Sequence, residues 1–365
     1  MIAREVLPMK SLYSLLISVV SVLLYSNLQV NEPFNEKFHG KQFSTFHMDY
    51  EEEIIEIGMI GDILLHYPLY NYESFLPSFE PIREELESLD ILLANQESIS
   101  AGTEFGYSGY PNFSSPKHII GDLKTVGVDM ISMANNHTLD QKEAGVLSAI
   151  NHIKKYDIPY IGAYESWEDQ KNDRILQVKD INFGFLGYTY GMNGYSTPNG
   201  KEYLVNQIDS ERVSEEIRTL KRKVDFVIVS IHWGNEYELD PNDEQKQLAL
   251  IMADAGADII FGHHPHVIQP YEMITTNEGS ETHVFYSVGN FFSGQTFDYT
   301  NIGGIAKVSI MKKMVNGNQA TVIGPLSFYA TAVLQGDPVS VYPLKDVETL
   351  MGQSDCWVQS HVFGK

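Results

Sequence analysis

The stretch Ile54-Ile55-Glu56-Ile57-Gly58-Met59-Ile60-Gly61-Asp62 is a short apolar run that ends in Gly-Asp. A run of this length and composition is typical of a buried β-strand. Further along the chain, apolar runs alternate with segments of helical pattern. This alternation predicts a mostly parallel sheet with helices on its faces, which is an α/β fold.

The expected elements follow one another in a regular order. Helices are expected over residues 81–88, 121–126, 142–155, 213–222 and 243–255. The strands that alternate with them are expected over residues 90–95, 129–134, 181–188, 225–231 and 258–261. Three later strands, over residues 284–287, 304–311 and 319–323, have no helices between them and predict a second, more antiparallel sheet.

Polar side chains that can bind metal ions stand at the end of one expected strand after another. They are Asp62, Asn95, Glu97, Asn136, His137, His232, His263, His264 and His266. In open α/β sheets the loops at the carboxyl ends of the strands converge on one crevice, so we expect these side chains to lie close together. A mixture of carboxylate, amide and imidazole groups suits Mn²⁺, Fe²⁺ or Zn²⁺.

Each of these residues also has a simpler interpretation when it is taken alone. Asp62 could cap a helix, and Glu97 and Asn136 could make hydrogen bonds within loops. His264 and His266, separated by a proline that restricts the backbone, can point the same way and bind neighbouring cations. The shared position at one end of the sheet favours a metal site over the simpler interpretations.

His137 directly follows Asn136, and Asp140 lies three residues further on. An imidazole beside a metal site could act as a general acid near neutral pH. Asp140 could orient that imidazole, or it could cap the helix that follows it.

The composition narrows the range of functions. The chain has 365 residues, with 25 Lys and Arg against 48 Asp and Glu, which gives a formal net charge of −23. Such an acidic surface repels phosphate backbones, so we expect no nucleic-acid partner. The single cysteine, Cys356, excludes a disulfide within the chain.

The N-terminal part predicts export. Between Lys10 and Glu32 lie 21 uncharged residues, enough to span the hydrocarbon core of a membrane as a helix. Arg4 and Lys10 precede this segment, which favours a cytoplasmic N-terminus and an extracellular main domain. A cleaved signal peptide is the alternative, but the segment ends without a good small-x-small site. We expect a single-pass protein of the cell membrane.

Six motifs occur in an order that resembles the CapA family, the capsule-synthesis proteins of bacterial poly-γ-glutamate biogenesis. They are Gly61-Asp62-Ile63, Asn95-Gln96-Glu97, Asn135-Asn136-His137, His232-Trp233-Gly234-Asn235-Glu236-Tyr237, Gly262-His263-His264-Pro265-His266-Val267 and Tyr286-Ser287-Val288-Gly289-Asn290-Phe291. The resemblance covers roughly residues 54–310. One difference is that residues 297–304 contain no arginine, which capsule-type relatives carry after Gly-Asn-Phe.

The resemblance implies a calcineurin-like metallophosphatase fold, a four-layer α/β/β/α sandwich. It implies a site for one or two divalent metal ions. By motif, the metal ligands would be Asp62, Glu97, Asn136, His232, His264 and His266, while His137 and His66 would face the substrate. It also implies an anionic polymer such as poly-γ-glutamate as ligand, and the ligase and carrier subunits of a capsule synthase as partners.

Two other functions stay open at this point: a metal-dependent hydrolase of phosphoester or amide bonds unrelated to capsule, and a non-catalytic accessory subunit of a polymer synthase. The expected division of the chain is a membrane segment over residues 1–30, a linker over 31–53, the main domain over 54–335 and a C-terminal tail over 336–365.

Overall fold

The computed structural model describes residues 50–297, 299–315 and 318–364. They belong to one compact unit, Asp49–Lys365. The expected membrane segment and nearly all of the expected linker lie outside the described residues. Among the described helices, none has the length and apolar character needed to cross a membrane.

The first sheet is built around the long strand β1 (Tyr50–Leu64). Its strand order is β14-β13-β12-β1-β2-β3-β4, and β11 also pairs with β1. The other members are β2 (Ile91–Asn95), β3 (Met130–Ser132), β4 (Tyr160–Ile161), β11 (Asn290–Ser293), β12 (Ile302–Val315), β13 (Asn318–Leu334) and β14 (Ser340–Pro343). Strands β2 and β11 run parallel to β1, whereas β12 runs antiparallel to it.

The second sheet has the strand order β5-β6-β7-β8-β10-β9. Its members are β5 (Arg174–Val178), β6 (Ile181–Thr189), β7 (Phe226–His232), β8 (Ile259–His263), β9 (Ile268–Thr275) and β10 (Glu281–Val288). The four inner strands are parallel, and the two edge strands are antiparallel to their neighbours.

The prediction that the three late strands form a second sheet of their own is wrong. Strands β12 and β13 join the first sheet, and β10 lies parallel to β8 in the other. The reason is the length of β1, which has 15 residues against five in β2. The remaining backbone groups of β1 need hydrogen-bond partners, and β12 supplies them over an antiparallel register from Tyr50 to Ile60.

Apolar clusters show how the layers pack. One cluster joins α2, α4 and α5 to the first sheet, another joins α7 and α8 to the second, and a third fills the space between the sheets. The chain is therefore a mixed α/β sandwich. The helices are α2 (Leu76–Phe79), α3 (Arg83–Glu87), α4 (His118–Thr125), α5 (Lys142–Lys154), α6 (Trp167–Lys171), α7 (Ser210–Lys221), α8 (Asp243–Ala255), α9 (Leu344–Met351) and α10 (Asp355–Phe363).

The five helices expected from the sequence are all present, at α3, α4, α5, α7 and α8. The segment expected to be a C-terminal tail instead belongs to the sandwich. It contributes β14, which pairs with β13, and the two helices α9 and α10. Val358 and Val362 of α10 are buried in the cluster between the sheets, so burial of apolar surface holds this segment in place.

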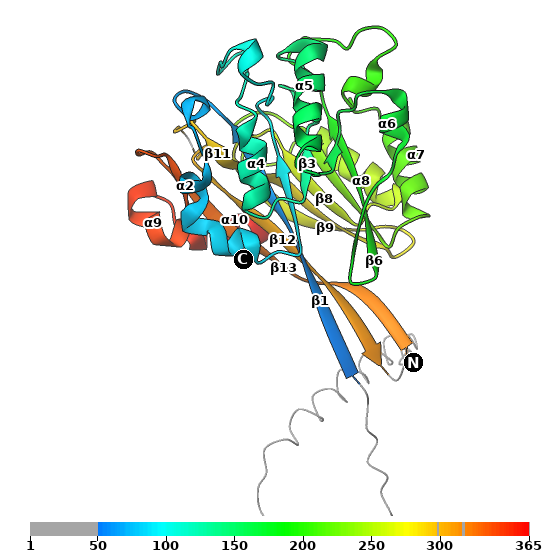
Figure 1. Ribbon diagram of the computed structural model, residues 1–365. Coiled ribbons are helices and arrows are strands. Elements are labelled where there is room, and N and C mark those ends of the chain that lie inside the picture. The colour runs from blue at the N-terminus through cyan, green and yellow to red at the C-terminus, as the bar shows by residue number, and fades with distance from the viewer. Residues whose placement is uncertain (1–49, 298, 316–317, 365) are drawn as a thin grey trace, which may run out of the picture. The chain divides into compact units, whose positions relative to one another are not determined.

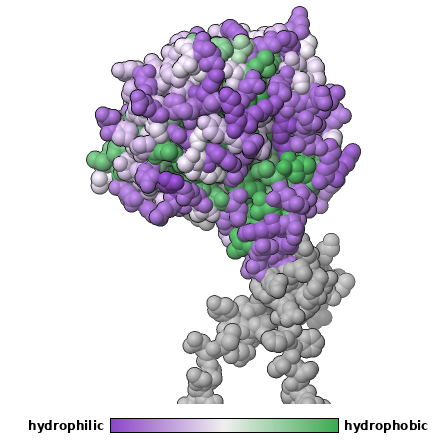
Figure 2. Space-filling view, in the orientation of Figure 1, coloured by the Kyte–Doolittle hydropathy of each residue, from purple (hydrophilic) through white to green (hydrophobic). Residues whose placement is uncertain are grey.

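Strands β1, β12 and β13 continue beyond the other strands as a long ribbon (Figure 1). At the opposite end of β1, the strand ends of both sheets come together. Figure 2 shows a mostly hydrophilic face, with apolar residues gathered where the ribbon meets the sandwich. The hydrophilic face agrees with a composition in which 20% of the residues are charged.

Candidate metal centre

Strand register places the polar strand ends beside one another. In the first sheet Asp62 of β1 lies opposite Asn95 of β2 and Asn290 of β11. In the second sheet His232 of β7 lies opposite His263 of β8. Parallel strands end at the same edge of a sheet, so the polar residues that follow them reach one crevice.

The backbone at Gly61 brings β1 unusually close to the turn before β11. A Cβ atom on Gly61 would lie 1.9 Å from the carbonyl oxygen of Gly289, so only glycine fits there. This close approach allows the amide of Asp62 to donate a hydrogen bond to Gly289 O at 3.0 Å. The glycine before the aspartate is therefore part of how the site is built.

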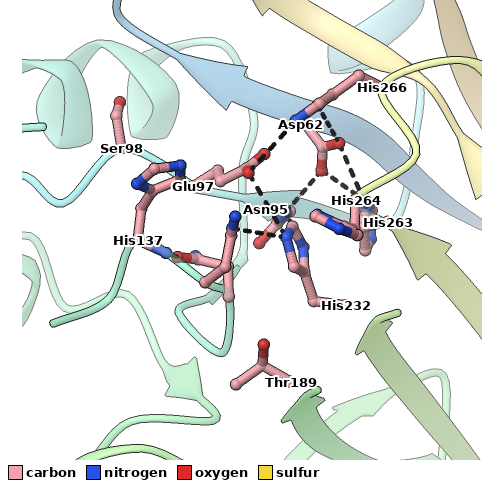
Figure 3. A network of polar contacts seen from close by, with 12 residues as sticks. Asp62, Asn95, Glu97, Ser98, His137, Thr189, His232, His263, His264 and His266 are labelled. Atoms are coloured by element: carbon pink, nitrogen blue, oxygen red, sulfur yellow. Dashed lines mark hydrogen bonds and ion pairs between the residues drawn. The ribbon is translucent and has the colours of Figure 1, made fainter. Parts of the chain in front are cut away.

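Asp62 is fully buried and holds the centre of the polar network (Figure 3). Its Oδ1 accepts from Asn95 Nδ2 at 2.7 Å and lies 3.4 Å from His263 Nδ1. Its Oδ2 accepts from the backbone amide of His264 at 3.2 Å and lies 3.2 Å from His266 Nδ1. Burial by itself raises the pKa of Asp62, but the hydrogen bonds and charges of His263 and His266 outweigh burial and hold the pKa well below its ordinary value.

Glu97 is also fully buried, but neither of its carboxylate oxygens has a hydrogen-bond partner. Its Oε1 lies 3.5 Å from His232 Nε2 and 3.7 Å from His266 Nε2. Burial, followed by the negative charge of Asp62 and Glu236, raises the pKa of Glu97 well above its ordinary value. A buried carboxylate without donors is costly unless a cation accompanies it.

The histidines present neutral imidazoles to the same space. Burial lowers the pKa of His232 well below its ordinary value, and burial lowers the pKa of His264 to about 3. His232 Nε2 lies 2.9 Å from Asn136 Oδ1, and His264 Nδ1 is buried without a partner. Neutral imidazole is the form that binds metal ions.

The loop that carries the histidines has an uncommon backbone conformation. His264 has φ +97° and His266 has φ +59°, a region that residues with a Cβ atom seldom adopt. Such conformations cluster at functional sites, where the surrounding structure holds them. Here the backbone turns both imidazoles toward the carboxylates of Asp62 and Glu97.

The donor set fits a divalent cation. Glu97, His232 and His264 offer ligand atoms within 4.8 Å of one another, and so do Asp62, Glu97 and His266. Asn136 lies next to the first group, because its Oδ1 contacts His232. The six residues expected to be metal ligands therefore converge, and mixed oxygen and nitrogen donors suit Mn²⁺, Fe²⁺ or Zn²⁺.

His137 and Asp140 form a buried pair at the side of this cluster. Asp140 Oδ2 lies 2.7 Å from His137 Nδ1 and also accepts from the backbone amide of Phe113 at 2.6 Å. The alternative, in which Asp140 caps the next helix, is wrong, because α5 has Gln141 at its N-cap and no side-chain cap. Asp140 is therefore placed to orient the imidazole.

His66 lies apart from the polar network. Its ring contacts the ring of Phe113 edge-on at 5.1 Å, and Phe113 in turn contacts the ring of His137 at 4.7 Å. Burial lowers the pKa of His66 to about 4, so its imidazole is neutral at pH 7. Phe113 therefore links His66 to His137 through ring contacts alone.

Asn290 and Asn193 were not among the polar side chains expected to converge, and His263 was expected there but was given no role of its own. His263 contacts Asp62, Asn290 Oδ1 lies 3.0 Å from His266 Nδ1, and Asn193 Oδ1 accepts from Asn136 Nδ2 at 3.3 Å. His263 and Asn290 both lie within the six motifs, so the sequence did mark their neighbourhood as part of the site. Asn193 lies in a loop after β6, where the sequence carries no polar motif to mark it.

Residues 56–295 match the model of the bacterial capsule synthesis protein family PGA_cap. The chain belongs to this family. It is 28% identical over 295 residues to the PGA biosynthesis protein CapA of Bacillus subtilis, covering 77% of this chain and 73% of that protein. It is 30% identical over 234 residues to the capsule biosynthesis protein CapA of Bacillus anthracis, covering 63% of this chain and 54% of that protein.

Among solved structures, this chain is similar to a putative 5′-nucleotidase from Staphylococcus aureus, with a TM-score of 0.49. The two are 15% identical, and the match covers 84% of this chain and 59% of that chain. It is also similar to a hypothetical protein from Thermus thermophilus, with a TM-score of 0.43 and 15% identity over 76% of this chain and 98% of that chain.

Proposed function

We propose that this protein acts in the synthesis or export of poly-γ-glutamate capsule or a related anionic envelope polymer, through a divalent-metal site on an extracellular domain. Membership of the capsule synthesis family and the names of the two Bacillus relatives support the biological role. The uncharged segment between Lys10 and Glu32 supports an anchor in the cell membrane. We further propose that the sandwich is of the four-layer metallophosphatase type.

The observation that carries the metal site is the environment of Glu97. Its carboxylate is fully buried, has no hydrogen-bond donor and faces imidazoles of His232 and His266. One nitrogen atom of each imidazole faces this carboxylate. A divalent cation would satisfy the carboxylate and the imidazoles together, whereas without one the Glu97 carboxylate stays buried and uncompensated.

The lack of positive charge in the surrounding loops suggests that an anionic polymer would need the cation in order to bind there. No Lys or Arg occurs in residues 63–68, 96–116, 133–141, 190–200, 233–242, 264–267 or 289–301, the loop segments around the cluster. A carboxylate-bearing polymer would meet no basic side chain of these segments. The metal would then supply the positive charge, so we expect polymer binding to require it.

A second candidate function is metal-dependent hydrolysis of a phosphoester or amide bond, and the His137–Asp140 pair favours it. A bound divalent cation supplies Lewis acidity that activates water near neutral pH. Within the chain, Asp140 holds the His137 ring through Nδ1, which leaves Nε2 to carry a proton for a leaving group. Asp62, through its contacts with His263 and His266, helps to position the neighbouring imidazoles.

A third candidate is a non-catalytic accessory subunit that binds ligase and carrier subunits of a membrane synthase. A variant of the site distinguishes this candidate from the other two, because activity depends on the residues of the site and not on the fold. His264→Ala in a strain that makes capsule would leave assembly of the synthase intact. Loss of capsule would support handling of polymer through the site, and normal capsule would leave only a scaffolding role.

The proposed function is tested most simply by metal analysis of the full chain purified in detergent. We expect one or two Mn²⁺, Fe²⁺ or Zn²⁺ ions per chain, and none in a Glu97→Ala, His232→Ala double variant. Assays of turnover with aryl phosphates and poly-γ-glutamate, with and without Mn²⁺, then distinguish metal-dependent hydrolysis from binding alone. A wild-type chain that binds no divalent ion at micromolar concentrations would overturn the proposal.

A further inference from the structure

The loop between β7 and α8 carries three exposed carboxylates, those of Glu236, Glu238 and Asp240. One carboxylate oxygen of Glu236 and one ring nitrogen each of His264 and His266 lie within 4.8 Å of one another. No Lys or Arg occurs in this loop to neutralise the three acidic side chains. The side of the metal centre that Glu236 faces is therefore negatively charged.

Exposed aromatic rings lie next to Glu236. Tyr237 is 40% exposed and Phe297 is 47% exposed, and their ring centroids lie 5.1 Å apart. The ring of Tyr237 also lies 6.1 Å from the ring of His266. A cation is attracted both by a carboxylate and by the face of an aromatic ring, so this surroundings favours a positively charged group of a ligand.

The loop that carries Glu236 is fixed to the histidine loop at two points. The backbone amide of Trp233 donates to His263 O at 3.1 Å, and the amide of Tyr237 donates to Pro265 O at 2.8 Å. These bonds hold the carboxylate and the ring in place before any ligand arrives. Binding therefore does not have to order this loop, which lowers its cost in entropy.

The buried part of the centre indicates which ligand group would lie beside this surface. The carboxylate oxygens of Glu97 and the Nδ1 atom of His264 are buried without hydrogen-bond partners, as expected where a metal ion is to be bound. A metal ion held there would take a carboxylate of the polymer. A positively charged group next to that carboxylate could then reach Glu236 and the two rings.

A γ-linked glutamate chain has such a pair of groups at one place. An internal residue offers a carboxylate and two amide groups, none of which is positively charged. The first residue of the chain carries a free ammonium group on the same carbon atom as its carboxylate. Internal residues would instead bring negative charge against Glu236, Glu238 and Asp240, which is unfavourable.

We propose that the protein recognises the free amino-terminal residue of the polymer rather than its interior. Glu236 accepts hydrogen bonds from the ammonium group, and the rings of Tyr237 and Phe297 pack against it. This inference rests on the proposed function, because the metal centre has to hold the neighbouring carboxylate. Each polymer chain then offers one binding site, however long the chain is.

The test uses the full chain in detergent with Mn²⁺, and two γ-linked glutamate oligomers of equal length. One oligomer has a free amino end, and in the other the amino end is acetylated, which turns the ammonium group into a neutral amide. We expect wild type to bind the free oligomer at least about tenfold more tightly in isothermal titration calorimetry. Equal affinity for the two would overturn the inference and leave metal-dependent binding of polymer intact. Binding of neither would overturn the proposed function, and the inference with it.

Three variants assign the preference to residues. Glu236→Gln keeps the size of the side chain and removes its charge, so it should bind the two oligomers equally with the manganese content of wild type. Phe297→Leu keeps an apolar side chain without a ring and should lower the preference about two- to fivefold. Glu238→Gln is the matched control and should keep the preference, because Glu238 is exposed on the same loop but accepts from Asn235. If Glu236→Gln keeps the preference, or loses manganese together with it, the inference is wrong.

Discussion

Asp62 and His266 meet across the two sheets of the sandwich, with Oδ2 of the aspartate 3.2 Å from Nδ1 of the imidazole. Asp62 lies near the end of β1 in the first sheet, and His266 follows β8 in the second. This contact joins the two halves of the candidate centre. A change at either residue should therefore weaken metal binding.

Replacing Glu97 by Gln separates the role of this residue in binding from its role in folding. The substitution removes a buried charge that has no donor, so the metal-free protein should be as stable as wild type or more stable by about 1 kcal/mol. The increase in Tm that Mn²⁺ gives to wild type should disappear. Calorimetry with and without Mn²⁺ measures both effects. A large loss of stability in the metal-free state would show that Glu97 has a structural role instead.

Substitution of Gly61 tests the close approach of β1 to Gly289. Gly61→Ala places a methyl group against a backbone carbonyl, and we expect a loss of about 1–3 kcal/mol in the free energy of unfolding together with weaker metal binding. Gly58→Ala is the control in the same strand, because its methyl group would meet the movable side chain of Leu89. Equal losses for the two variants in urea denaturation would contradict this explanation.

The fold class and the convergence of the six expected ligands could be predicted because each lies at or just after the end of an apolar strand, and parallel strands share one end. The placement of β12 and β13 could not be predicted, because an apolar run does not reveal which sheet a strand joins. Helix α10 was missed because only Val358 and Val362 of its short span are buried. Asn193 lies far from the motifs in sequence, and only the folded loop brings it to Asn136.

Replacing Asp140 by Asn tests the orientation of His137. If the protein hydrolyses phosphoesters, the variant should lose about 10–100-fold in kcat with unchanged metal content, because the imidazole loses its carboxylate partner. Asp157→Asn, in an exposed position outside the site, should behave as wild type. Steady-state kinetics with an aryl phosphate, together with metal analysis, check this. A fall in metal content instead of kcat would place Asp140 in metal binding.

The partly buried ion pair of Asp169 and Arg174 predicts a pH-dependent contribution to stability. Burial alone raises the pKa of Asp169, but hydrogen bonds from Tyr160 and the backbone of Glu165 and the pairing with Arg174 lower it below 3.8. The carboxylate therefore stabilises the fold above the unfolded pKa, and this stabilisation is lost as the pH falls through the folded pKa. Asp169→Asn should cost about 1–3 kcal/mol at pH 7.

Urea denaturation of wild type and Asp169→Asn between pH 7 and pH 3 measures the dependence. The difference between the two proteins should stay constant down to about pH 5 and shrink below pH 4. Asp173→Asn, which removes a more exposed pair with Lys223, should cost less than about 1 kcal/mol at pH 7. A difference for Asp169 that persists unchanged at pH 3 would show that its charge does not stabilise the fold.

Retention of an anionic polymer should depend on the metal, because the loops around the cluster carry no basic side chain. We expect the full chain to retain poly-γ-glutamate in the presence of Mn²⁺ and to release it after addition of a chelator. Binding measured by sedimentation with labelled polymer at constant ionic strength checks this. Equal retention before and after chelation would assign polymer binding to another surface.

The metal centre itself is tested most directly by crystals of the protein grown with Mn²⁺ and measured for anomalous scattering. We expect a peak at about 2.0–2.3 Å from the carboxylate of Glu97 and from the ring nitrogens of His232 and His264. Absence of any peak in this crevice, with the carboxyl group of Glu97 hydrogen-bonded to protein or water instead, would contradict the central claim.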